Sequence, residues 1–155
     1  MARNLTALRL VVPSIWAGMI IAIDLIEAPL KFQAPGITIP LGLGIGRLVF
    51  TAMNAVEVVL FVLFAVALWR TSAPVRDRWI AGALGMLLLV KIAVLRPLMA
   101  ARTDAVIAGT GDPGSFVHFG YIGVDAVIGV LLLWIVIRQC RQLVDQGPAV
   151  PTAAR

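Results

Sequence analysis

Four long apolar stretches, at residues 8–30, 48–69, 79–96 and 116–137, constrain the fold of this chain more than any other feature. A helix needs about 17–25 predominantly apolar residues to cross the hydrocarbon core of a bilayer, and each stretch is long enough. Inside hydrocarbon, backbone polar groups must be satisfied within the segment, which favours helices. The pattern therefore predicts an all-α polytopic membrane protein, a four-transmembrane-helix bundle.

The composition agrees with a membrane protein that has a single domain. Of the 155 residues, 61% are hydrophobic and only 14% are charged, whereas soluble domains carry about 25% charged residues. The length suits one bundle with short connections. We therefore predict one domain over residues 1–145 and a disordered cytoplasmic tail over 146–155.

The first and third connections between the stretches contain helix-breaking residues. Residues 32–46 include Pro40 and the glycine-rich run GLGIG at 42–46, which argue against a regular helix. Pro97 disfavours helical geometry at the residue before it, so the third helix is expected to end at Arg96. We expect the 32–46 connection to be irregular and either to lie in the membrane interface or to fold back over the mouth of the bundle.

The basic residues predict the orientation in the membrane. Eight of the 13 Lys and Arg residues belong to the two ends of the chain and the second connection, against four in the first and third connections. The positive-inside rule then places both termini in the cytoplasm. Trp69, Trp79 and Trp134 would lie near that face, as interfacial aromatic residues do. Abundant Ala, Gly, Val and Arg suggest a bacterial chain, hence a multi-pass protein of the bacterial inner membrane.

Ionisable residues interrupt the apolar stretches on one side of the membrane. His118, Tyr121 and Asp125 fall on one stripe of the last helix. With alternating helix directions, polar residues of the other helices come to the same outer level. A charge within hydrocarbon is costly and by default faces the interior as part of a functional site. We expect an outward-facing polar chamber above a sealed apolar plug.

Two sets of residues are candidates for the chemistry of this chamber. An acid–base enzyme would use a histidine near neutrality, a phenol donor and a desolvated carboxylate. The candidate catalytic residues are His118, Tyr121, Asp125 and Glu57. The candidate ligand-binding residues are Asp24, Glu27, Arg47, Asn54 and Lys91.

Three functions are consistent with this pattern of charged residues. The leading hypothesis is that the chamber binds or passes a small polar or ionic ligand, coupled to protonation of Asp125 or Glu57. The alternative is a membrane-embedded acid–base enzyme acting on a small lipophilic substrate. In the third, the charges pair only to hold the bundle together, and the chain is a structural accessory subunit of a membrane complex.

Other classes of function lack a supporting pattern. His118 is the only histidine and Cys140 the only cysteine, so we expect no metal site and no cofactor. No basic run with interleaved aromatic residues accompanies the formal charge of +5, so we expect no nucleic-acid partner. The expected partners are the lipid bilayer and a small polar or lipophilic ligand, with a homo-oligomer or a larger membrane complex left open.

Several segments have the look of family signatures. They are IEAPLKF at 26–32, GRLVFTAMNAVE at 46–57, LRPLMAARTDAVIAG at 95–109 and HFGYIGVDA at 118–126. In these the chain resembles small bacterial four-helix inner-membrane proteins of unknown function. The resemblance covers the whole chain and implies the class of fold, but it transfers no activity and no functional residue.

Overall fold

The computed structural model describes residues 2–111 and 116–145, and within these ranges every regular element is a helix. The first helical stretch comprises α1 (Ala2–Ile20), the π-helix η1 (Ile21–Glu27), α2 (Ala28–Leu30) and the 3₁₀ turn η2 (Lys31–Gln33). The second is α3 (Ile39–Trp69), the third comprises α4 (Val75–Val90), the π-helix η3 (Lys91–Leu95) and α5 (Arg96–Ile107), and the fourth is α6 (Phe116–Asp145). The tail predicted over 146–155 lies outside the described residues.

Each of the four stretches contains a helix that is long and apolar enough to cross a membrane, namely Leu5–Gln33, Ile39–Trp69, Val75–Ile107 and Phe116–Val144. This confirms the predicted all-helical class and the four long apolar helices. The helices extend beyond the apolar residues: α4 begins at Val75 and α6 continues to Asp145. Helical hydrogen bonds do not depend on apolar side chains, so polar residues at the helix ends continue the same helix.

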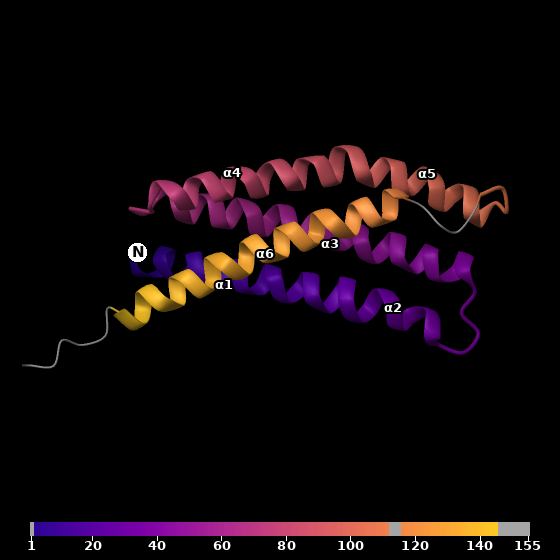
Figure 1. Ribbon diagram of the computed structural model, residues 1–155, viewed down its shortest axis with the longest axis horizontal. Helices are drawn as coiled ribbons and strands as arrows, with labels where there is room; N and C mark the ends of the chain where they lie inside the picture. The colour runs from indigo at the N-terminus through magenta and orange to yellow at the C-terminus, as the bar shows by residue number, and fades with distance from the viewer. Residues whose placement is uncertain (1, 112–115, 146–155) are drawn as a thin grey trace, which may run out of the picture.

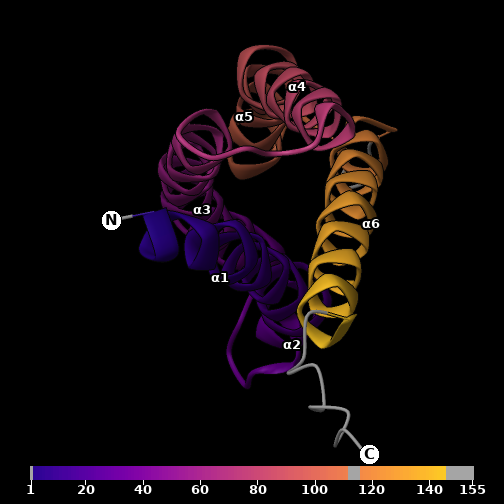
Figure 2. The same cartoon turned by 90° about the vertical axis from the view of Figure 1, so that its left-hand side faces the viewer.

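The four stretches run roughly side by side and alternate in direction (Figure 1). Viewed from the end that holds the N-terminus, α1, α3, α4 and α6 surround a common axis, and each contacts the next (Figure 2). We call the end with the start of α1, the α3–α4 turn and the last turns of α6 the termini end. The α2–α3 connection, the end of α5 and the start of α6 lie at the opposite end.

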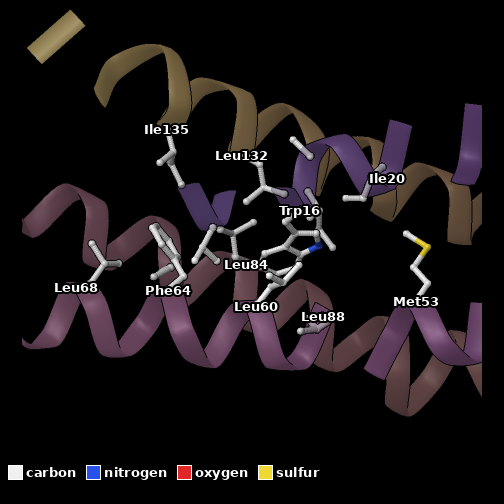
Figure 3. Close-up of a cluster of buried hydrophobic side chains, with 14 of the residues drawn as sticks. Trp16, Ile20, Met53, Leu60, Phe64, Leu68, Leu84, Leu88, Leu132 and Ile135 are labelled. Carbon is white, nitrogen blue, oxygen red and sulfur yellow. The ribbon is translucent and has the colours of Figure 1, made fainter. Parts of the chain in front are cut away.

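An apolar core fills the bundle between these two ends. Trp16, Phe64, Leu84 and Leu132 come from four different helices, and each is 0% exposed (Figure 3). Large apolar side chains also cover the outside: Leu48 is 73% exposed, and many others on all four stretches are exposed as well. An apolar exterior of this extent is typical of helices that face lipid.

The expectation of an irregular connection over 32–46 is wrong for its second half, because α3 begins at Ile39. The Thr38 side chain caps the helix by accepting a hydrogen bond from the backbone N–H of Leu41, and Pro40 occupies the first turn, where its missing N–H costs little. At Gly42 a Cβ atom would overlap the ring of Phe32. Gly42 therefore permits close packing of the first helical stretch against α3 rather than ending a helix.

The expectation that the third helix ends at Arg96 is also wrong, because the chain continues as α5 to Ile107. The helix passes Pro97 by widening into the π-helical segment η3 just before it. Proline lacks an N–H and crowds the carbonyl four residues earlier, and a wider turn removes that conflict. The first stretch has the same arrangement, because the π-helical segment η1 lies just before Pro29.

Candidate functional site

A buried ion triad joins three of the helical stretches. The ammonium group of Lys91 lies 2.7 Å from Glu57 Oε2 and also donates to Asp125 Oδ1. Lys91 and Glu57 are 0% exposed and Asp125 is 1% exposed. Glu57 comes from α3, Lys91 from the first position of η3 and Asp125 from α6. The apolar stretches thus meet at a site that is sealed from the surroundings.

Three more side chains complete this sealed site. Trp16 on α1 donates its indole N–H to Glu57 Oε1 at 3.0 Å, so both oxygens of that carboxylate have partners. Tyr121 donates its hydroxyl to Asn54 Oδ1 at 2.8 Å, and the Lys91 ammonium lies 4.8 Å from the centre of its ring. Every helical stretch therefore contributes to the network around the Glu57–Lys91–Asp125 triad.

Asp24 differs from the triad because its charge has no direct partner. Both of its carboxylate oxygens are covered, yet neither accepts a hydrogen bond from a described residue. Asp125 Oδ2 is in the same situation. Asp24 is close enough to Lys91, Asp125 and Glu57 to interact with them electrostatically. The site thus holds three carboxylates and one ammonium, with three carboxylate oxygens free to receive a donor.

The two π-helical segments carry charged residues of the site. Asp24 and Glu27 lie in η1, and Lys91 begins η3. A π-helical turn inserts an extra residue relative to an α-helix and so changes the direction in which the following side chains point. Segments of this kind are frequent at functional sites. Here they place Asp24 and Lys91 toward a common interior.

A pocket of about 580 Å³ lies beside the triad, toward the opposite end of the bundle. Its volume is in the range of sites that bind small molecules. Its polar lining consists of Asp24, Lys31, Arg47, Arg96, Arg102, Thr103 and His118. The rest of the wall is glycine and apolar side chains, including Phe32, Phe50 and Ile122. Asp24 is the residue that belongs to both the pocket and the charged group around Lys91.

The basic residues of the pocket differ in how they are neutralised. Lys31 pairs with Glu27 at 3.2 Å and Arg47 pairs with Asp104 at 2.5 Å. Arg96 instead donates to neutral acceptors, the carbonyl of Arg47 at 3.0 Å and the hydroxyl of Thr51. The pocket therefore has paired cations on one part of its wall and a guanidinium without a described carboxylate partner on another.

A second ion cluster lies at the termini end, where an apolar plug alone was expected. Asp77, 2% exposed, accepts from Arg9 at 3.2 Å and from Arg138. Gln139 donates to the backbone carbonyl of Arg9 at 2.8 Å, and the Arg138 guanidinium lies 5.5 Å from the ring centre of Trp134. The apolar layer is present, but this Arg9–Asp77–Arg138 cluster closes the bundle beyond it.

The residues predicted as site members occupy three environments. Glu57, Lys91 and Asp125 form the sealed triad, and Asn54 and Tyr121 are buried as a hydrogen-bonded pair. The remaining candidates lie at the pocket: Asp24, Arg47 and His118 line it, and Glu27 holds Lys31 there. Tyr121 and Asp125 share a stripe of α6 with His118, but His118 is exposed and the other two are buried.

Sequence reasoning missed three contributors. Trp16 resembled any other apolar residue of its stretch, and its role depends on Glu57, which is 41 residues away. Arg96 was identified only as a residue at a helix end, although it lines the pocket. Asp77 lies between Arg76 and Arg78, a pattern typical of a solvated turn. Only its burial between distant arginines reveals its role.

Within the part of the chain that the structure describes, no three His, Cys, Asp or Glu side chains are grouped so as to hold a metal ion. Comparison with known proteins suggests no function for the site, because no family model, no curated protein and no solved structure matches this chain.

Proposed function

We propose that this chain is a bacterial inner-membrane protein whose interior pocket binds a small ionic or polar ligand, with binding coupled to a proton on Asp24 and Asp125. The observation that carries the proposal is the Asp24 carboxylate, which is covered, lacks a donor among the described residues and is part of the pocket wall. A site that served packing alone would be expected to leave no such group, because an unsatisfied buried charge costs several kcal/mol.

The charge balance around Lys91 supports a role for a proton. Asp24, Glu57 and Asp125 face one ammonium group, so full ionisation would leave two uncompensated negative charges in an apolar interior. A proton held between Asp24 and Asp125 would remove one charge and supply the donor that their free oxygens lack. Entry of a ligand into the pocket would alter that balance, which is how proton and ligand binding become coupled.

The proposed orientation places both termini in the cytoplasm and the pocket toward the outside. Trp69 and Trp79 support it, because they lie at the termini end and are 85% and 76% exposed. Tryptophan is enriched at membrane interfaces, and the basic residues are more numerous at that end. The apolar core and the Arg9–Asp77–Arg138 cluster would separate the pocket from the cytoplasm.

Infrared spectroscopy of the full chain in phosphatidylcholine bilayers tests the proton site. We expect a carboxylic-acid carbonyl band that changes across a step in pH, that disappears in Asp24→Asn and that shifts in Asp125→Asn. Asp104→Asn is the matched control, because Asp104 is an exposed carboxylate paired with Arg47. The proposal fails if the wild-type protein has no such band, or if the band is unchanged in Asp24→Asn.

The sealed geometry of the triad favours a second candidate, the structural accessory subunit. Lys91 and both of its carboxylate partners are almost completely enclosed, as an ion group that only fixes helix register would be. Replacing the whole triad by neutral residues separates the two functions. An accessory subunit would still assemble and support its cellular role, whereas the proposed binding protein would assemble with a shifted carboxylic-acid band and lose that role.

A further inference from the structure

The pocket wall contains arginines whose positive charge is not neutralised by a neighbouring carboxylate. Two of its arginines, Arg96 and Arg102, have no carboxylate partner among the described residues, whereas Lys31 and Arg47 have one each. The positive charge in the pocket wall is therefore only partly neutralised by the protein. A cationic ligand would meet repulsion there, and an anionic headgroup would meet two available guanidinium groups.

The Arg96 side chain is oriented as well as charged. Its guanidinium is held by the carbonyl of Arg47 and the hydroxyl of Thr51, both on α3. These contacts use neutral acceptors and leave the positive charge available. A planar guanidinium matches the two oxygens of a carboxylate or phosphate, and such charge-assisted pairs are stronger than neutral hydrogen bonds.

Most of the remaining pocket wall is apolar and reaches the outside of the bundle. Leu25, Phe32 and Ile39 line the pocket and are 68%, 42% and 49% exposed. They belong to the exposed apolar surface that covers the four stretches. A ligand whose headgroup lies at the arginines therefore has an apolar path for a tail, continuous with that exterior surface.

We infer that the ligand of this pocket is an amphiphilic anion, with a carboxylate or phosphate headgroup at Arg96 and Arg102 and an apolar tail along Leu25, Phe32 and Ile39. This rests on the proposed function and names its ligand class. The anion would lie on the same pocket wall as Asp24, where two negative charges repel each other. Binding of the anion and binding of a proton at Asp24 therefore favour each other, by linkage.

Equilibrium binding of radiolabelled decanoate to the full chain in phosphatidylcholine nanodiscs tests this inference, with empty nanodiscs measured in parallel. We expect saturable binding that decyl phosphate displaces and that neither decyltrimethylammonium nor decyl maltoside displaces. Arg102→Gln should weaken decanoate binding about tenfold, the loss of one charge-assisted hydrogen bond. Arg102 is exposed and has no described contact to disturb. Arg96→Gln should weaken binding at least as much.

Arg70→Gln is the matched control, because Arg70 is an exposed arginine at the α3–α4 turn, away from the pocket. It should bind decanoate like the wild type. The inference is overturned if decanoate binding is not saturable, if both pocket variants bind like the control, or if the cationic probe displaces decanoate as well as decyl phosphate does.

Nanodiscs that contain phosphatidylglycerol identify the source of the anion. Loss of decanoate binding there supports an anionic lipid of the bilayer as the occupant, and unchanged binding supports a free amphiphilic acid.

The infrared band distinguishes the proposed proton site from the proposed ligand class. If decanoate does not bind but the Asp24-dependent band is present, the ligand class is wrong and the proton site stands. If the band is also absent, the proposed function is wrong.

Discussion

At the scale of single residues, one ammonium group determines the electrostatics of the interior. Lys91 Nζ is shared by Glu57 and Asp125 on two other helices, and none of the three side chains is accessible. Bringing these charges out of water is costly, so the triad as a whole need not be strongly stabilising. Removing one member is different, because its partners then remain buried and uncompensated.

We therefore predict that Lys91→Met strongly destabilises the protein, by about 3–5 kcal/mol in the free energy of unfolding. The triple variant Lys91→Met, Glu57→Gln, Asp125→Asn should recover most of that loss, because the two carboxylates that paired directly with Lys91 are then neutral as well. Equilibrium unfolding in mixed detergent micelles measures both. A single variant as stable as the wild type would contradict the buried triad.

At the scale of helical elements, backbone geometry brings the charged residues together. Both π-helical segments occur just before a proline, Pro29 or Pro97, and both contain charged residues of the site. The first stretch also packs closely on α3, where Phe32 covers Gly42. Asp24 of η1 lines the pocket together with Phe32 and Gly42, so a change in helix packing there should alter both stability and binding.

Two glycines of α3 provide a matched test of this packing. In Gly42→Ala the new methyl group would overlap the Phe32 ring, so we expect a loss of about 1–3 kcal/mol, as for other overpacked sites. At Gly44 an added methyl group would have no neighbouring atom within 4 Å. Gly44→Ala should therefore be neutral or stabilise the helix by up to about 1 kcal/mol. Thermal unfolding in detergent compares them.

Adding Phe32→Ala to Gly42→Ala should restore part of the lost stability, because it removes the ring that the methyl group meets. Equal stability of the two alanine variants would show that Phe32 and Gly42 are not in contact. A general effect of alanine on helix propensity would change the stability of both variants in the same direction. A loss of stability in Gly42→Ala together with a gain in Gly44→Ala therefore identifies the contact with Phe32 as the cause.

The four long helices could be predicted from the sequence, but only part of the candidate site could. The four apolar stretches and the ionisable residues within them, such as Lys91 and Asp125, stand out against their apolar neighbours. The start of α3 was not predictable, because local glycine preferences conflict with a contact that forms only in the folded bundle. The same limit applies to Asp77, whose partners Arg9 and Arg138 are 68 and 61 residues away.

At the scale of the whole molecule, the two ends of the bundle differ in chemistry. The termini end carries the Arg9–Asp77–Arg138 cluster and the exposed tryptophans Trp69 and Trp79. The opposite end carries the pocket and its connections. This asymmetry is what makes an orientation in the membrane testable.

We predict that a membrane-impermeant maleimide applied to intact spheroplasts labels Ala34→Cys, in the α2–α3 connection, when Cys140 is replaced by serine. Ser72→Cys, in the α3–α4 turn, should react only after permeabilisation. In the chain without substitutions the native Cys140 should behave in the same way, because it is exposed at the same termini end. The reverse pattern would place the termini outside. Reaction of both engineered cysteines in intact spheroplasts would contradict a bundle that separates the two faces.

The separation of the two ion clusters along the bundle has an electrical consequence. With all groups ionised, the Arg9–Asp77–Arg138 cluster carries a net positive charge, and Asp24 with its neighbours carries a net negative one. In the proposed orientation, a proton reaching Asp24 from outside crosses part of the membrane voltage, whose full drop is worth about 2.3 kcal/mol per charge at 100 mV. A negative interior would therefore favour the protonated state, so an energised membrane would itself help to set the occupancy of the site.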